Sequence, residues 1–110
     1  MNCDLVAQIV LPSENTISVE EFAKVYKNEN QMERCCLVDC RNEVQFNITH
    51  LDKARNLPFK ATLRDPSEIR SLAEQHDKVY IMCRRGIDSK DLTDKLLKNS
   101  EAQISNVVNV

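Results

Sequence analysis

The residues best suited to chemistry in this chain are a cysteine, Cys83, and the loop that follows it. An apolar, β-prone run over residues 79–82 leads into Cys83, and the loop behind it carries the single glycine among 110 residues. A strand, a tight loop and a helix N-terminus in this order gather backbone N–H groups into a cradle for an anion. A thiol at such a cradle is stabilised as the thiolate by the helix dipole, the N–H groups and nearby arginines. The pattern therefore predicts that Cys83 is a nucleophile.

The predicted anion-binding loop comprises the six residues after the cysteine: Arg84, Arg85, Gly86, Ile87, Asp88 and Ser89. Asp88 and Ser89 are both favourable N-cap residues, so we expect a helix to follow over residues 90–98. The alternative is that Cys83 is an apolar filler at a strand end, as most cysteines are. We favour the nucleophile because a cysteine that only packs in the core does not require two arginines and a glycine turn beside it. Arg84 and Arg85 either steer an acidic partner towards the cysteine or are simply solvated.

The composition excludes several classes of protein. Hydrophobic residues make up 42% of the chain and charged residues 29%, which is ordinary for one globular domain. A net charge of −2, no tryptophan and two tyrosines leave neither a basic surface nor a stacking surface for nucleic acid. No segment has the pattern of a signal peptide or the length of a membrane span. Five cysteines without a Cys-x-x-Cys pair argue against a disulfide framework or metal site, and for a reducing, cytoplasmic location.

The remaining pattern alternates strands with helices after a predicted linker over residues 1–15. We expect strands over residues 16–18, 35–38, 53–58, 78–82 and 106–110. Helices are predicted from Ser18, which forms an S-x-x-E capping box with Glu21, and from Ser67, with a short helical turn within residues 42–52. Strands alternating with helices predict an α/β fold, in which a parallel sheet of about five strands lies in a three-layer α/β/α arrangement. Residues 16–110 would form this single domain.

Ligands of such sheets bind beyond the carboxyl ends of the strands, where Cys83 and the Asp39-Cys40-Arg41 run are both expected. Asp39 and Arg41 either position the Cys83 loop or form a structural ion pair, and the structural role is the favoured one. Cys40 lies on the same side of the sheet as Cys83 and could resolve an adduct of that thiol as a disulfide, although simple burial is favoured. His50 and His76 are expected to be structural.

Several of these residues also carry a resemblance to the rhodanese family. The pattern D-x-R…E-x-x-x-G-H-I-x-G-A-x-N-I-P of that family is similar to a series of positions here, and its six-residue active-site loop resembles residues 83–88. The matching positions are Asp39, Arg41, Glu43, His50, Leu51, Ala54, Asn56, Leu57 and Pro58. The likeness extends over residues 17–110. Its C-R-x-G-x-D-S form most resembles the C-terminal rhodanese domain of adenylyltransferase–sulfurtransferases that act on ubiquitin-like sulfur carriers.

The resemblance implies a sulfurtransferase in which Cys83 carries a persulfide and needs no other cofactor. Its partners would be a ubiquitin-like sulfur carrier, whose activated C-terminus receives the sulfur, and a protein persulfide donor such as a cysteine desulfurase. The implied pathways are tRNA 2-thiolation and molybdopterin synthesis. Loop amides would hold the charge of the persulfide without a histidine base.

Three departures from the family pattern carry expectations of their own. Thr49 and Lys53 replace glycines, so the turn around His50 must take another course. Asp88 places a carboxylate in the loop, and at about 5 Å this costs an incoming anion about 3 kcal/mol, so dianionic thiosulfate should be a poor donor. The chain ends at Val110, before the glycine pair and closing helix of the family, which predicts a C-terminally truncated domain with one sheet face under-covered.

Two other functions compete with sulfur transfer. An inactive rhodanese-like module could bind a partner through the same loop, although an intact cysteine and glycine argue against it. A phosphatase is suggested by the Asp39-Cys40-Arg41 run, but that chemistry needs an arginine six positions after the cysteine to clamp phosphate. Ser89 occupies that position, so we set the phosphatase aside.

Overall fold

The computed structural model describes residues 8–110 and centres on a parallel sheet. The sheet has 4 strands in the order β2-β1-β3-β4. They are β1 (Cys35–Asp39), β2 (Ala54–Asn56), β3 (Lys78–Met82) and β4 (Val107–Asn109). This is one fewer than predicted, because residues 16–18 contribute only a bridge between Thr16 and Asn109 before the chain turns into a helix at Ser18.

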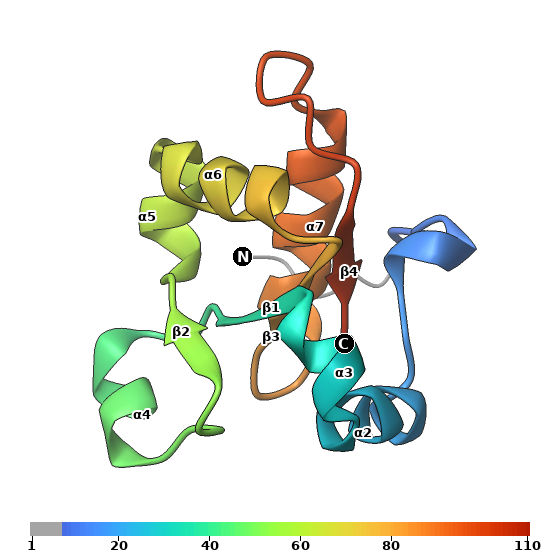
Figure 1. Ribbon diagram of the computed structural model, residues 1–110. Helices are drawn as coiled ribbons and strands as arrows, with labels where there is room; N and C mark the ends of the chain where they lie inside the picture. The colour runs from blue at the N-terminus through green and yellow to red at the C-terminus, as the bar shows by residue number, and fades with distance from the viewer. Residues whose placement is uncertain (1–7) are drawn as a thin grey trace.

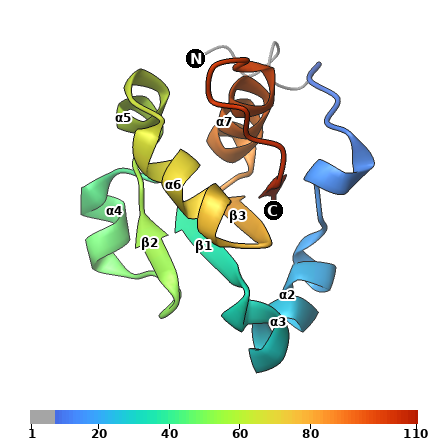
Figure 2. The same cartoon turned by 45° about the horizontal axis from the view of Figure 1, so that its top comes forward.

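Helices cover both faces of the sheet, which confirms the three-layer α/β/α prediction (Figure 1). One face of the sheet is covered by α2 (Val19–Lys27) and α3 (Glu29–Glu33). The helices on the other face are α5 (Phe59–Arg64), α6 (Ser67–Gln75) and α7 (Ile87–Lys98). Figure 2 shows the same arrangement from above, with α4 (Glu43–Ile48) standing apart beside the edge strand β2.

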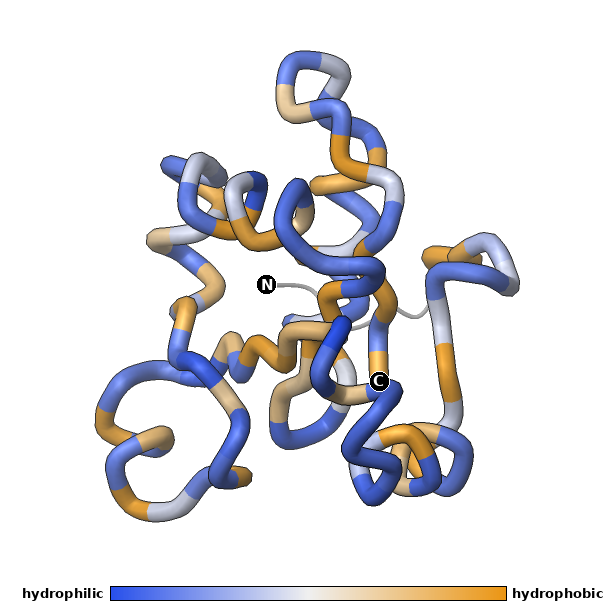
Figure 3. Tube along the Cα trace, in the orientation of Figure 1, coloured by the Kyte–Doolittle hydropathy of each residue, from blue (hydrophilic) through white to orange (hydrophobic). Residues whose placement is uncertain are grey.

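The core divides at the sheet because successive side chains of a strand point to opposite faces. Val38 and Ile81 pack towards α6 and α7, whereas Leu37 and Tyr80 pack towards α2 and α3. Figure 3 shows the hydrophobic residues gathered along these central strands, while the outer loops are mostly hydrophilic. The two central strands, β1 and β3, are therefore fixed by packing on both sides, and their carboxyl ends are fixed with them.

Local signals account for most helix positions. The Glu21 N–H donates to the Ser18 hydroxyl at 3.1 Å, as the capping box predicts. In α6 the predicted apolar face is buried, with Ile69 fully inaccessible. α5 was not predicted, since Pro58 was read only as the end of a strand. Pro58 in fact lies directly before the first residue of this helix, as its N-cap, with φ −57° and ψ 141°.

The predicted linker over residues 1–15 lies partly outside the described residues, which begin at 8. Ser13–Asn15 form a short 3-10 helix, η1. The Asn15 amide is buried and donates to the carbonyl oxygens of Ser105 and Val107 at 3.0 and 2.8 Å. Residues 13–15 therefore pack against the domain. No helix within residues 8–110 is both long and apolar enough to cross a bilayer.

Candidate active site

The loop after β3 turns directly into the N-terminus of α7. Gly86 is the N-cap of this helix and has φ +76°, a left-handed conformation that favours glycine. A Cβ at this position would meet nothing within 4 Å, so the glycine serves the backbone angle and not a close approach. The helix begins at Ile87, three residues earlier than predicted. Asp88 and Ser89 are consequently part of its first turn and not its caps.

This early start aims the free N–H groups of the first turn at the sulfur of Cys83. The Gly86 N–H donates to Sγ at 3.1 Å and the Ser89 N–H at 3.4 Å. The Ser89 hydroxyl, which is fully buried, lies 3.3 Å from the same sulfur and is the donor when the thiol is ionised. The loop is therefore folded around one atom, and its polar hydrogens point at a negative charge on that atom.

These contacts make Cys83 an acidic thiol. Its pKa is lowered to about 5, first by a hydrogen bond from the Cys40 thiol and then by the Ser89 hydroxyl and the N–H groups of Ser89 and Arg85, against the opposing effect of burial. The Arg84 and Arg85 side chains are exposed and form no ion pair or side-chain hydrogen bond with any residue of 8–110. Short-range donors thus stabilise the thiolate that the sequence predicted.

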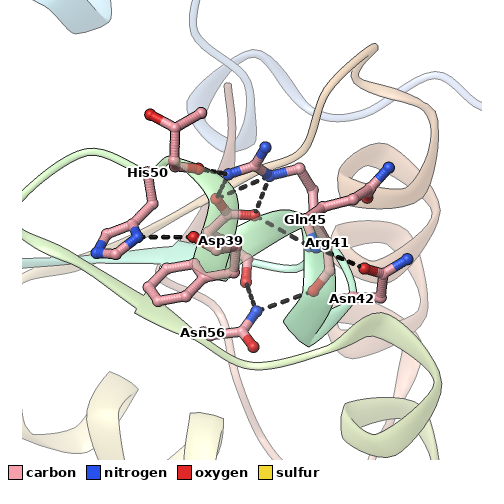
Figure 4. A network of polar contacts seen from close by, with 8 residues as sticks. Asp39, Arg41, Asn42, Gln45, His50 and Asn56 are labelled. Carbon is pink, nitrogen blue, oxygen red and sulfur yellow. Dashed lines mark hydrogen bonds and ion pairs between the residues drawn. The ribbon is translucent and has the colours of Figure 1, made fainter.

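Asp39 and Arg41 form a separate, self-contained pair at the end of β1 (Figure 4). Arg41 Nη2 and Nε donate to the Asp39 carboxylate at 2.7 and 3.0 Å, and Asp39 is 1% exposed. Arg41 Nη2 also donates to the Thr49 carbonyl at 2.7 Å. Asn56 Nδ2 bonds the carbonyl oxygens of Asp39 and Arg41 at 3.1 and 2.9 Å. Within residues 8–110 neither side chain of the pair hydrogen-bonds to the Cys83 loop, so its direct contacts are structural.

Cys40 lies between the Asp39–Arg41 pair and the Cys83 loop. It is 1% exposed, and its N–H donates to the Met82 carbonyl at 2.9 Å, beside Cys83. Its thiol is a hydrogen-bond donor to Cys83, and this bond together with burial raises the pKa of Cys40 far above its ordinary value. The predicted burial is therefore observed, and Cys40 and Cys83 line the same pocket.

A pocket of about 910 Å³ opens over Cys83. Its floor contains both cysteines, and its walls come from the end of β1, the start of α4, α5 and the loop. Burial, the Cys83 thiolate and Asp91 raise the pKa of the wall residue Asp88. Besides this one carboxyl, the pocket is lined by five basic residues: Arg41, Lys60, Arg64, Arg84 and Arg85.

The sequence profile of rhodanese-like domains matches residues 18–110. This chain belongs to the rhodanese family.

Several curated relatives, each called adenylyltransferase and sulfurtransferase UBA4, share this domain. The protein from Debaryomyces hansenii is 37% identical over 101 residues, covering 88% of this chain and 22% of that protein. The Yarrowia lipolytica protein is 31% identical over 96 residues, with 87% and 22% covered. The Saccharomyces cerevisiae protein is 32% identical over 97 residues, with 82% and 22% covered. The chain thus spans about a fifth of the length of these relatives.

The backbone of this rhodanese domain explains why Thr49 can stand where the family pattern has glycine. Thr49 has extended backbone angles, φ −163° and ψ 143°, so the turn before His50 needs no glycine. His50 stacks on Phe46 with ring centroids 3.8 Å apart, and His76 bonds the Leu72 carbonyl at 2.7 Å. Each ring is therefore held by a contact within the chain, and neither histidine is among the residues lining the pocket.

Sequence reasoning missed the contribution of α5 to the site. This helix supplies Phe59, Lys60, Ala61 and Arg64 to the pocket wall. The Phe59 N–H donates to the Cys40 carbonyl at 3.0 Å, which ties the start of the helix to the end of β1. Pro58 followed by a short run without turn residues was the available signal for the helix.

Proposed function

We propose that this rhodanese domain is a sulfurtransferase in which Cys83 accepts a sulfane sulfur as a persulfide and passes it on. The observation that carries the proposal is the convergence of the Gly86 and Ser89 N–H groups on Cys83 Sγ, at 3.1 and 3.4 Å. Sulfur transfer is the attack of a thiolate on a sulfur electrophile, so its rate depends on the thiolate fraction and on access. A pKa of about 5 keeps Cys83 ionised at neutral pH, and the pocket gives access.

The same donors suit the persulfide that follows. Once Cys83 carries the outer sulfur, the negative charge moves to that atom, at the N-terminus of α7. Backbone N–H groups and the helix dipole stabilise an anion there without a base. α7 has 12 residues, so its dipole is well developed.

The exposed cations suggest the class of acceptor. Lys60, Arg64, Arg84 and Arg85 surround the opening, and none is in a salt bridge with another residue of 8–110. They would attract an anionic tail, and an extended chain end can enter an open pocket where a folded surface cannot. Together with the name of the relatives, this supports the activated C-terminus of a ubiquitin-like sulfur carrier as the acceptor. The proposed setting of the transfer is tRNA 2-thiolation and molybdopterin synthesis in the cytoplasm.

The carboxyl of Asp88 suggests the class of donor. It lies in the pocket wall, where an ionised carboxylate repels a dianion such as thiosulfate more strongly than a thiol-bound sulfane sulfur. The proposed donor is therefore a protein persulfide, such as that of a cysteine desulfurase.

Intact mass spectrometry tests the proposal. The 110-residue chain is incubated with a cysteine desulfurase and cysteine, or with inorganic polysulfide, and weighed without reductant. We expect the gain of one sulfur atom, its absence in Cys83→Ser, and its retention in Cys36→Ser, where a buried β1 thiol away from the pocket is replaced. A folded wild-type chain that gains no sulfur would instead indicate a module that binds partners without catalysis.

A further inference from the structure

Cys40 and Cys83 occupy neighbouring ends of two paired strands. In the β1–β3 pair Asp39 lies opposite Met82, so Cys40 and Cys83 are the next residues in the same register. Adjacent strands lie about 4.8 Å apart, and a disulfide requires Cα atoms about 4.4–6.8 Å apart. Both side chains pack into the core cluster on the α7 side of the sheet. The backbone thus places these two thiols at the spacing and on the common face that a disulfide needs.

The two cysteines also line the same pocket. Cys40 keeps its proton because it is buried next to an ionised Cys83, and it donates that proton in a hydrogen bond. Among the cysteines of residues 8–110, Cys35 points to the opposite face of the sheet. Cys36 shares the face of Cys40 but lies four residues earlier, about 13 Å along the strand at about 3.3 Å per residue. Cys40 is thus the one described thiol within reach of Cys83.

We propose that Cys40 discharges the Cys83 persulfide when no acceptor is present, closing a Cys40–Cys83 disulfide and releasing hydrosulfide. This inference rests on the proposed function, since it begins from a loaded Cys83. It assigns Cys40 as a second catalytic thiol, which limits how long the domain holds a sulfur that it cannot deliver.

The step balances without an external oxidant. The Cys40 thiol gives its proton to the outer sulfur, and the Cys40 sulfur then forms a bond to Cys83 Sγ. The bond between Cys83 Sγ and the outer sulfur breaks, and its electron pair leaves with that sulfur as HS⁻. The sulfane sulfur is reduced to sulfide, and each cysteine is oxidised by one electron. A dithiol reductant returns both cysteines to their starting state.

Burial of Cys40 makes this discharge slow and shields Cys40 from reagents in solution. At 1% exposure Cys40 is inaccessible to external thiols and oxidants. Its raised pKa keeps the thiolate scarce, so attack is slower than delivery to an acceptor that is already bound. The proximity of the two sulfurs offsets this scarcity, because a positioned intramolecular nucleophile acts at a high effective concentration.

The test follows the fate of the added sulfur. Wild type, Cys40→Ser, Cys40→Ala and the control Cys36→Ser are loaded with inorganic polysulfide, desalted and kept without acceptor. Intact mass and released sulfide are measured over time. We expect wild type and Cys36→Ser to lose the added sulfur, release one equivalent of sulfide and end two hydrogens lighter than the reduced chain. Both Cys40 variants should keep the sulfur about tenfold longer or more.

The outcomes separate the two proposals. The alanine variant, which brings no hydroxyl into the apolar core, guards against misfolding of the serine variant. If the Cys40 variants load but lose sulfur as fast as wild type, or if wild type keeps it and forms no Cys40–Cys83 disulfide, Cys40 is not the discharging thiol and the sulfurtransferase assignment stands. If no folded variant or wild type gains sulfur at all, the proposed function fails and this inference fails with it.

Discussion

The ends of β1 and β3 lie side by side, but their polar groups are arranged in opposite ways. At the end of β1 the charges are satisfied within the chain, since Asp39 binds Arg41 and Arg41 also binds the Thr49 carbonyl. At the end of β3 the N–H groups converge on Cys83, and Arg84 and Arg85 have no charged partner among residues 8–110. The end of β1 is therefore paired internally, whereas the end of β3 presents the thiol that the proposed sulfurtransferase would use.

Removing Asp39 tests the structural half of this comparison and should have the largest effect. In Asp39→Ala the Arg41 guanidinium, whose side chain is only 18% exposed, loses its carboxylate. We expect the free energy of unfolding to fall by about 3 kcal/mol, the scale for an uncompensated buried charge. Chemical denaturation measures it.

The matched control is Asp77→Ala, which breaks an ion pair with Arg34 in which both side chains are more than 60% exposed, at 67% and 69%. That pair is screened by solvent, so its loss should change stability by less than about 1 kcal/mol. Equal effects of the two substitutions would mean that the end of β1 is not a structural anchor.

Gly86 tests the reactive half through its backbone. Gly86 and Gln103 are the two residues with positive φ in the described chain, at +76° and +53°. Gly86→Ala forces a side chain into that conformation and should cost about 1–2 kcal/mol. Gln103→Gly relieves the same type of strain and should be neutral or stabilising by up to about 1 kcal/mol.

Thiol titration then distinguishes the two positive-φ sites. Gly86→Ala displaces an N–H donor from Cys83 and should raise the pKa of that thiol, whereas Gln103→Gly should leave it unchanged. A Cys83 pKa that is unmoved in Gly86→Ala would show that the loop does not depend on this turn to hold the thiolate.

The part of this design that is encoded locally could be predicted from the sequence. The Ser18 cap, the buried run of β1 and the loop between Cys83 and Ser89 all depend on residues close in sequence. The start of α7 was misplaced because Asp88 and Ser89 are good caps, but the backbone uses Gly86 as the cap so that the first turn can face the sulfur. Two local signals competed, and the contact with Cys83 decided between them.

The sequence placed Cys40 and Cys83 on the same side of the sheet, but it could not show that the two residues are neighbours, because that depends on strand register. A shift of one residue between β1 and β3 would turn Cys40 to the other face of the sheet. The register is fixed by packing on both faces, and it places Cys40 N–H against the Met82 carbonyl. Likewise α5 has six residues, too few to show a helical period, and it is positioned by its bond to the end of β1.

The substitution that removes the fewest atoms takes one hydroxyl away from the loop after β3. Ser89→Ala keeps the Ser89 N–H but removes the hydroxyl that lies 3.3 Å from Cys83 Sγ. A hydrogen bond to a charged group contributes about 1.5–3 kcal/mol, so the pKa of Cys83 should rise from about 5 by about 1–2 units. The rate of alkylation as a function of pH reports this shift, and Ser71→Ala on the exposed surface of α6 is the control.

The same shift must appear in stability, with a sign fixed by linkage. The pKa of Cys83 is lower in the folded chain, at about 5, than its ordinary value of 9.0. The folded state therefore binds fewer protons between these values, and the contribution of this thiol to stability grows as the pH rises from about 5 to 9 and is lost as the pH falls back through 5. In Ser89→Ala the growth should begin at a higher pH and be smaller, and in Cys83→Ala it should vanish. Denaturation curves of Ser89→Ala and wild type that keep a constant separation across this range would show that the hydroxyl packs beside Cys83 without stabilising its charge.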